Sequence, residues 1–360
     1  MSNDYAKRRK AAALELKQRK LDCLLVTHVP NWYYLTGFTG ESAALILSED
    51  GATLLTDGRF TIQAKEETAG VKIELQKEGL YTSVGNYLKQ AGLERVGFDP
   101  QHWTVEQMGT LRKACKGRCK TVEAAGVVEA LRMKKDAREL ATMRKAAILA
   151  GDVLESVLKL IRPGIRESEI GAEIEYQMRK RGASGASFES IVASGERSAL
   201  PHARPTSKRL RKNELVVLDL GAILDNYCSD MTRTVYLGKA PKRVRQWYGA
   251  VQEAQSAGVN AVKAGVSCGE VDAAARDVLK RSGLENHFVH STGHGLGLEV
   301  HEEPRIARGQ KVRLAVGNVV TIEPGVYFEG VGGIRIEDDV VVNAGKGEVL
   351  TRVTRDLIEL

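Results

Sequence analysis

Residues 215–238, LVVLDLGAILDNYCSDMTRTVYLG, have the pattern of a β-hairpin. An apolar strand leads to turn residues at Asp225-Asn226, and a second strand returns from them. Antiparallel strands joined by so short a turn need no helical crossover between them. This part of the chain is therefore expected to lack the regular strand–helix alternation of a parallel sheet.

Amphipathic helices are predicted on both sides of the hairpin. The segment 167–182 places Ile170, Ile174 and Met178 on one face. The helices expected in this half of the chain are 134–161, 167–182, 243–263 and 267–282. Because helices and strands are grouped here and do not alternate, we expect an α+β domain over residues 128–360.

The first third of the chain alternates short apolar runs with helical segments, which predicts a smaller α/β domain over residues 1–127. Strands are expected at 21–29, 42–49, 52–58 and 95–99, and helices at 61–69, 81–90 and 104–115. Thr104 and Gln107 have the spacing of a capping box at the start of the last helix. A length of 360 residues also suits two domains.

Composition indicates a globular protein of a reducing compartment. Hydrophobic residues make up 43% of the chain and charged residues 28%, a balance typical of folded domains in water. No apolar run approaches the ~20 residues of a membrane span, and charges interrupt the apolar patches of the basic N-terminus, which is expected to form an amphipathic helix. Neither a membrane anchor nor a signal peptide is therefore expected. Five scattered cysteines favour the cytoplasm over a disulfide-bonded secreted fold.

Two other kinds of partner are not favoured. The net charge of +7 invites a nucleic-acid interpretation, but the basic clusters are short and separated, and aromatic residues make up only 5% of the chain. Solvated surface explains these clusters better, so no nucleic acid is expected. Cys115 and Cys119 lie four residues apart, yet the sequence around them offers no two further zinc ligands.

Two acids, Asp219 and Asp230, interrupt the apolar strands of the hairpin. With the turn centred on 225–226, residue 219 pairs with residue 232, and residue 230 is its diagonal neighbour on the same face. Diagonal positions lie ~7–8 Å apart, a gap that one or two metal ions can bridge. The alternative is a buried carboxylate satisfied by hydrogen bonds, but two facing carboxylates resist burial unless they are paired or bind a metal.

A second pair of acids lies near the C-terminus, in VVTIEPGVYFEGVGGIRIEDDVVV. Glu323 closes one apolar strand, and Glu337 lies within the next. Arg335 is two residues before Glu337 and so shares its strand face. Two strand pairs would then each present two acids.

Two histidines, His294 and His301, lie in STGHGLGLEVHEEP, residues 291–304, among glycines that make a helix unfavourable. In an extended segment their odd spacing would send the two rings to opposite faces, so we expect them to have different roles. Four acids and one histidine would supply five ligands, mostly oxygen donors. Such a set suits a pair of divalent ions, Mn²⁺, Co²⁺, Fe²⁺ or Zn²⁺, better than a sulfur-rich structural zinc site.

The order LDLG…YCSDMTRT, STGHGLGLEVHEEP, TIEPGVY and GGIRIEDD resembles the pita-bread metallopeptidases. Within that family it is similar to the proline-specific branch, the Xaa-Pro aminopeptidases and the Xaa-Pro dipeptidases, or prolidases. The segment THVPNWYYLTGFTGESAALIL resembles the creatinase-type N-terminal domain of that branch, so the similarity covers essentially the whole chain. It implies a creatinase-like domain over 1–127, a pita-bread catalytic domain over 128–360, and a homodimer.

The resemblance assigns roles to individual residues. The metal ligands that it implies are Asp219, Asp230, His294, Glu323 and Glu337. Asp230 and Glu337 would bridge two ions, with Mn²⁺ or Co²⁺ expected and Zn²⁺ or Fe²⁺ as alternatives. The substrate-side residues that it implies are Phe188, Ile191, His202, His301 and Arg335. Of these, the phenylalanine and isoleucine would line the proline pocket, the histidines would lie near the scissile bond, and the arginine would lie beside the bridging glutamate.

The activity implied is hydrolysis of the Xaa-Pro bond at the N-terminus of peptides, by a hydroxide held between the two ions. Glu323 would take the proton of the water and pass it to the leaving nitrogen, and His202 and His301 would stabilise the oxyanion. A compact apolar pocket would recognise the proline ring. Neutral imidazoles and ionised carboxylates predict lower activity on the acid side of pH 7.

Three related proteins offer alternatives. A dipeptidase restricted to Xaa-Pro dipeptides has the same metal chemistry, and Arg335 could either hold the carboxylate of such a dipeptide or brace Glu337. Creatine amidinohydrolase shares the fold but lacks this ligand set. Non-catalytic pita-bread modules that bind histones or RNA have typically lost ligands, and here none of the five is missing.

Overall fold

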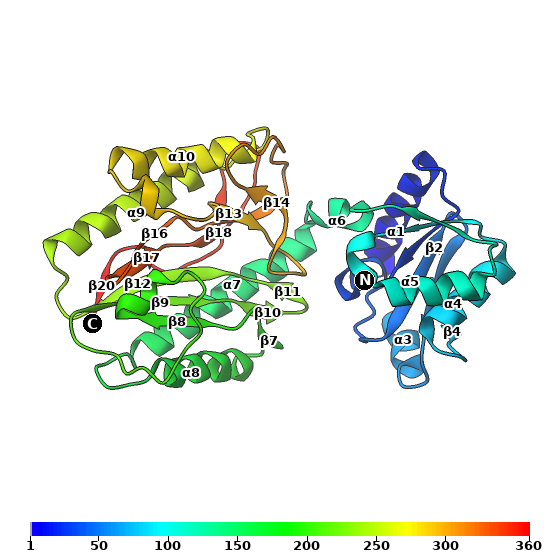
Figure 1. The fold of residues 1–360 in the computed structure, drawn as a ribbon, viewed down its shortest axis with the longest axis horizontal. Coiled ribbons are helices and arrows are strands. Elements are labelled where there is room, and N and C mark those ends of the chain that lie inside the picture. The colour runs from blue at the N-terminus through cyan, green and yellow to red at the C-terminus, as the bar shows by residue number, and fades with distance from the viewer. Residues whose placement is uncertain (1) are drawn as a thin grey trace. The chain divides into compact units, whose positions relative to one another are not determined.

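The computed structural model describes residues 2–360, which form two compact units. The first unit ends at Arg132, and the second runs from Met133 to Leu360 (Figure 1). The boundary predicted between residues 127 and 128 lies at the start of a short helix, α6 (Val127–Arg132). Within the described residues, no helix is both long and apolar enough to cross a membrane.

The first unit is built on a mixed sheet with the strand order β4-β3-β2-β1-β5-β6. Its elements are α1 (Ser2–Gln18), β1 (Cys23–Val26), α2 (Val29–Thr36), β2 (Ala43–Ser48), β3 (Gly51–Thr56), α3 (Thr61–Glu67), β4 (Lys72–Leu75), α4 (Leu80–Ala91), β5 (Arg95–Phe98), α5 (Val105–Cys115), β6 (Lys120–Glu123) and α6. Every strand and helix predicted in this part of the chain is present. The predicted capping box of Thr104 and Gln107 forms at the start of α5.

Helices α2 and α6 and strands β4 and β6 are absent from the sequence prediction. Helix α2 has the sequence VPNWYYLT, whose aromatic and β-branched residues have weak helix propensity. Tertiary burial of Trp32, Tyr34 and Leu35 stabilises it instead. The two missed strands form the edges of the sheet, where polar side chains obscure the alternation that identifies a strand.

The second unit has the grouped helices and strands that the sequence predicts. Its elements are α7 (Ala137–Leu158), α8 (Glu167–Lys180), β7 (Gly185–Ala186), β8 (Ile191–Ser194), β9 (Glu214–Leu220), β10 (Ala222–Leu224), β11 (Tyr227–Cys228), β12 (Met231–Leu237), α9 (Lys242–Ala261), α10 (Cys268–Arg281), β13 (Gly293–Gly295), β14 (Glu302–Ile306), β15 (Val319–Ile322), β16 (Gly325–Phe328), β17 (Gly332–Arg335), β18 (Asp338–Val341), β19 (Glu348–Val349) and β20 (Ile358–Glu359). Two sheets dominate, with the orders β20-β12-β9-β8 and β14-β13-β15-β18-β19.

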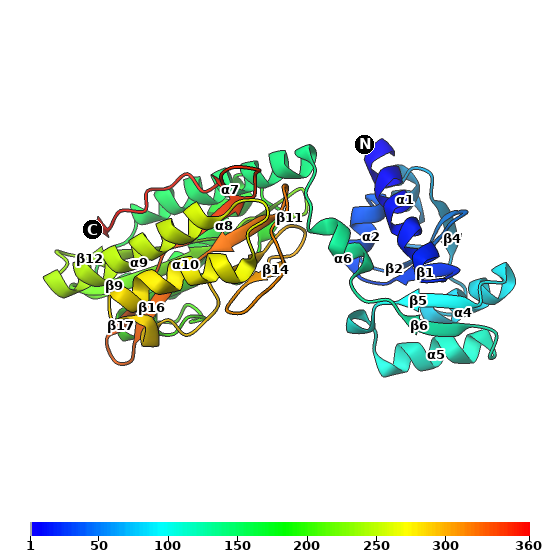
Figure 2. The same ribbon diagram turned by 90° about the horizontal axis from the view of Figure 1, so that it is seen from above.

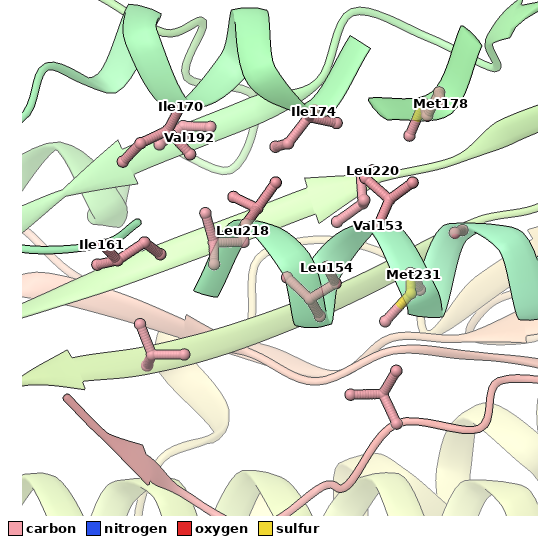
Figure 3. Packing of buried hydrophobic residues seen from close by; sticks show 14 of the residues in the cluster. Val153, Leu154, Ile161, Ile170, Ile174, Met178, Val192, Leu218, Leu220 and Met231 are labelled. Carbon is pink, nitrogen blue, oxygen red and sulfur yellow. The ribbon is translucent and has the colours of Figure 1, made fainter. Parts of the chain in front are cut away.

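The two helix pairs lie on opposite sides of these strands. Helices α7 and α8 share a core with β8, β9 and β12, whereas α9 and α10 pack over strands β14 to β18 (Figures 1 and 2). Figure 3 shows the predicted apolar face of α8, Ile170, Ile174 and Met178, directed toward Leu218 and Leu220 of β9. All five side chains are fully buried, and truncation of such a residue to alanine costs about 2–5 kcal/mol.

Candidate metal centre

Strands β9 and β12 form the long hairpin of the second unit, with Asp219 opposite Thr232. The tip, β10–β11, keeps the same register, and Asp225 and Asn226 at the turn have φ values of 47° and 69°. These left-handed values are typical of a two-residue type I′ turn, which Asn and Asp tolerate. The predicted pairing of residues 219 and 232 is therefore confirmed, and it brings Asp230, just before β12, close to Asp219.

Glu323 and Glu337 meet through a similar pairing. Strands β15 and β18 are antiparallel with Ile322 opposite Asp338, and the two glutamates are the next residues in that register. The chain between them forms a separate two-stranded ribbon, β16–β17. Glu337 therefore lies in the short link between β17 and β18, and not within a strand as predicted.

His294 is the central residue of β13, a three-residue strand whose glycines approach other backbone segments closely. A Cβ atom at Gly293 would lie 1.9 Å from the carbonyl oxygen of Thr321, and one at Gly295 would lie 2.3 Å from that of Glu303. Only glycine fits at such distances. The GHG motif thus lets the backbone of β13 sit deep in the sheet, with the imidazole near the acids.

Three of the five predicted ligands lie within reach of a single ion. One ligand atom from each of Asp230, His294 and Glu337 lies within 4.8 Å of the other two. The fourth residue, Glu323, is close as well, because His294 Nε2 lies 3.5 Å from Glu323 Oε1 and 3.8 Å from Asp230 Oδ2. These groups could hold a metal ion jointly.

Asp219 is held from one side by Arg335, whose Nη2 donates a 2.6 Å hydrogen bond to Oδ2. The other carboxylate oxygen, Oδ1, is buried and has no hydrogen-bond partner among the described residues. A buried carboxylate oxygen without a partner is costly, and coordination of a cation would satisfy it.

The carboxylates disfavour one another's charged forms. Burial, and then the charge of Glu337, raises the pKa of Asp230 well above its ordinary value. Burial, followed by the charges of Glu323 and Asp219, does the same to the pKa of Glu337. Burial also raises the pKa of Glu323 to about 7. Bound cations would allow Asp230, Glu323 and Glu337 to be ionised together at neutral pH, so this oxygen-rich donor set fits divalent ions.

The two histidines of the glycine-rich segment are neighbours. The ring centroids of His294 and His301 are 4.3 Å apart, with the planes at 63°. The prediction that they leave opposite faces of one extended strand is wrong, because the chain turns back after β13 and pairs Gly295 with Glu302. Burial, and then the charges of His294 and His202, lowers the pKa of His301, so the exposed His202 lies within electrostatic range of His301.

The two residues predicted to line the proline pocket differ in their surroundings. Ile191 is buried at the start of β8, lies opposite Asp219 of β9, and packs against Ala203, the neighbour of His202 in the chain. Phe188 is half-buried, three residues before β8 begins. The structure thus brings Ile191 to the acid cluster directly.

Three residues that sequence reasoning did not single out complete the centre. Tyr327 OH accepts a 2.9 Å hydrogen bond from Arg335 Nη1 and lies 2.8 Å from His290 Nε2. Thr232 Oγ1 accepts from Arg335 Nε at 3.0 Å and donates to Glu337 Oε2 at 2.6 Å. Each of the three lies two to four residues from a predicted metal ligand, and this proximity in the sequence could have identified them as candidates.

This fold and this buried cluster define a metallopeptidase of the pita-bread type. Residues 141–344 match metallopeptidase family M24, and residues 8–134 match the Creatinase/Prolidase N-terminal domain. The chain belongs to metallopeptidase family M24 and is an enzyme of the peptidase type. The α+β fold class and the resemblance to the proline-specific branch are confirmed, and membership of this family implies bound divalent metal.

Relatives match over almost the whole chain. The Xaa-Pro dipeptidase of Pyrococcus furiosus is 34% identical over 95% of this chain and 97% of its own length. The solved structure of the Xaa-Pro dipeptidase from Bacillus anthracis has a TM-score of 0.96 at 36% identity, covering 99% of this chain and 100% of that one. The X-Pro aminopeptidase from Thermotoga maritima has a TM-score of 0.88 at 34% identity, with coverage of 96% and 100%.

Proposed function

We propose that this enzyme hydrolyses the bond between an N-terminal residue and proline, with Xaa-Pro dipeptides as its main substrates. The sequence alone led us to expect an aminopeptidase acting on longer peptides, with a dipeptidase as the alternative. The names of the relatives from Pyrococcus and Bacillus favour the dipeptidase. The similarity to the Thermotoga X-Pro aminopeptidase keeps the longer substrates as a second candidate.

The observation that carries the proposal is the buried cluster of acids around one imidazole. We assign Asp219, Asp230, His294, Glu323 and Glu337 as the metal ligands. Asp230 and Glu337 would be shared between two divalent ions, Mn²⁺ or Co²⁺ in preference to Zn²⁺ or Fe²⁺, because oxygen donors dominate the set. When bound, such ions polarise the scissile carbonyl and lower the pKa of water.

The protein's own residues then bind the substrate and move protons. Glu323 accepts the proton of the attacking water and delivers it to the proline nitrogen. His202 and His301 donate hydrogen bonds to the oxygen that becomes negative as the carbonyl is attacked. Phe188 and Ile191 contact the pyrrolidine ring, which lacks the N–H that other peptidases grip.

Arg335 is proposed to position catalytic groups. Its guanidinium already donates hydrogen bonds to Asp219, Thr232, Tyr327 and the carbonyl of Pro201. These occupy four of the five N–H groups of an arginine, which supports a bracing role over capture of a substrate carboxylate.

The deciding experiment compares an Xaa-Pro dipeptide with the matching Xaa-Pro-Yaa tripeptide on enzyme reconstituted with Mn²⁺ or Co²⁺. Turnover confined to Ala-Pro supports the dipeptidase, and release of alanine from Ala-Pro-Ala at a similar rate supports the aminopeptidase. Ala-Ala serves as the control for proline specificity. If neither proline peptide is cleaved, or if full activity survives chelation of the metal, the proposal is wrong.

Two further expectations accompany this function. A homodimer is proposed from the resemblance to the proline-specific branch. A cytoplasmic location is proposed because all five cysteines are free thiols, which suits a reducing compartment.

A further inference from the structure

The first unit contains two histidines, His28 and His102, and they lie directly against each other. Their ring centroids are 3.8 Å apart and the planes are inclined by only 9°. Glu129 joins them, because His102 Nε2 lies 3.4 Å from Glu129 Oε1. A chain with seven histidines thus places the only two of this unit beside one carboxylate, far from each other in sequence.

The three side chains come from three separate elements of the first unit. His28 is the residue before α2, His102 closes the short 3₁₀ turn Pro100–His102, and Glu129 lies in α6. The carboxylate is fixed in place by a neighbouring amide, since Asn31 Nδ2 donates a 2.5 Å hydrogen bond to Glu129 Oε1. Arg132 in turn donates to Asn31 Oδ1 at 2.7 Å.

A small cavity adjoins these groups. Its volume is about 20 Å³, which is enough for one water molecule or one ion. Its lining combines apolar side chains with six polar residues, Thr27, His28, Asn31, Asp99, His102 and Glu129. The cavity therefore offers room for one small occupant beside two imidazoles and a carboxylate.

We propose that His28, His102 and Glu129 bind one divalent transition-metal ion, in a site separate from the acid cluster of the second unit. One ligand atom from each residue lies within 4.8 Å of the other two. Two histidines and one carboxylate, with a water in the fourth position, are a common donor set for Zn²⁺. Because the side chains of His102 and Glu129 are 22% and 29% exposed, that water can come from solvent.

Metal binding requires one local rearrangement. Ligand atoms around tetrahedral Zn²⁺ lie about 2.0–2.2 Å from the ion and hence about 3.4 Å from one another, so the cluster must contract. An ion bound by an imidazole lies in the plane of that ring, and two stacked rings share no such plane. One ring must therefore turn out of the stack, and the ion would then tie α2, the 3₁₀ turn and α6 together.

The site is independent of the proposed peptidase function, because none of its ligands belongs to the catalytic unit. Its test compares the full-length enzyme with the His102→Gln and Glu129→Gln variants, all saturated with Zn²⁺ alone and then desalted. Zinc per chain is measured by plasma mass spectrometry. We expect the wild type to retain one equivalent more than either variant, since the catalytic centre contributes equally to all three proteins.

Thermal unfolding supplies the second measurement. Zn²⁺ should raise the unfolding midpoint of the first unit in the wild type and in Glu123→Gln, an exposed glutamate of the same unit, and should raise it less in His102→Gln. A metal-free unfolding midpoint of His102→Gln close to that of the wild type shows that the variant is folded. Equal zinc content in the wild type and both variants overturns the proposal, even if the peptidase is fully active.

Discussion

Arg335 Nη2 lies 2.6 Å from Asp219 Oδ2, and both side chains are buried. The same guanidinium reaches Glu337 through Thr232, which accepts from Arg335 Nε and donates to Glu337 Oε2. It also donates to the carbonyl of Pro201. The Arg335 guanidinium therefore links Asp219 of the β9–β12 hairpin, Glu337 between β17 and β18, and the loop that carries His202.

Replacing Arg335 should disrupt the centre more than it disrupts the fold. In Arg335→Lys, a single ammonium cannot donate to Asp219, Thr232, Tyr327 and Pro201 in the same geometry. We expect metal affinity or kcat to fall about 10–100-fold, the range typical for residues that orient metal ligands. Metal content and Xaa-Pro turnover are the measurements, with the exposed Arg352→Lys as the matched control. Normal metal content together with normal turnover would remove Arg335 from this role.

The ligand assignment has its own test in the bridging acids. Asp230→Ala and Glu337→Ala should each abolish both metal retention and turnover, because each removes a donor proposed to be shared by two ions. Asp225→Asn is the control within the same hairpin, since asparagine suits the left-handed φ of 47° at the turn. That variant should keep its metal and its activity. Turnover by a metal-free bridging variant would contradict the assignment.

The metal-free enzyme should lose stability as pH rises. Unfolded aspartate and glutamate ionise near about pH 4, whereas burial and neighbouring charges raise the pKa values of Asp230, Glu323 and Glu337, with that of Glu323 at about 7. The native state then holds protons that the unfolded state has released. The free energy of unfolding should therefore fall between about pH 5 and about pH 7.

Bound metal should reverse this trend, because it stabilises the ionised carboxylates. The gap in unfolding midpoint between Mn²⁺-loaded and metal-free enzyme should thus widen over the same pH range, as measured by calorimetry. Glu337→Gln removes one of the groups with a raised pKa and should flatten the slope of the metal-free protein. Identical slopes for the wild type and this variant would show that the acid cluster does not titrate as a buried group.

Local chemistry explains which parts of the centre were predictable. The pairing of residues 219 and 232 follows from the Asp225-Asn226 turn, because a two-residue turn sets the register of both strands. The burial of Ile174 on one face of α8 follows from the helical spacing of the apolar residues in that segment. These features depend on residues that are neighbours in the chain.

The features that were missed depend on contacts between distant segments. Arg335 shares a strand face with Glu337, yet its closest acid is Asp219, 116 residues away and brought near by the packing of two hairpins. The contact of His294 with His301 depends on a reversal of the chain after β13. The glycine-rich sequence lacks the alternation of apolar and polar residues that would indicate this hairpin. Helix α2 forms through burial despite weak propensity.

Glu167, at the start of α8, holds both ends of the loop that contains His202. Its Oε1 accepts hydrogen bonds from the amide and the hydroxyl of Ser194, and its Oε2 accepts from those of Thr206 and from Arg197 Nε. Burial by itself raises the pKa of Glu167, but the hydrogen bonds from Thr206 and Ser194 outweigh it and hold the pKa below its ordinary value. This fully buried carboxylate is therefore ionised in the native state.

Glu167→Gln should misplace His202 without touching the metal ligands. The amide group of glutamine would face N–H donors, so some of the five hydrogen bonds must break, at a cost of about 1–3 kcal/mol in the free energy of unfolding. We expect kcat/KM for an Xaa-Pro dipeptide to fall by up to about 100-fold, while metal content stays normal. The exposed Glu175→Gln is the control. If the effect acts through His202, the double variant Glu167→Gln/His202→Ala should be no slower than His202→Ala alone, whereas additive losses would assign Glu167 a different role.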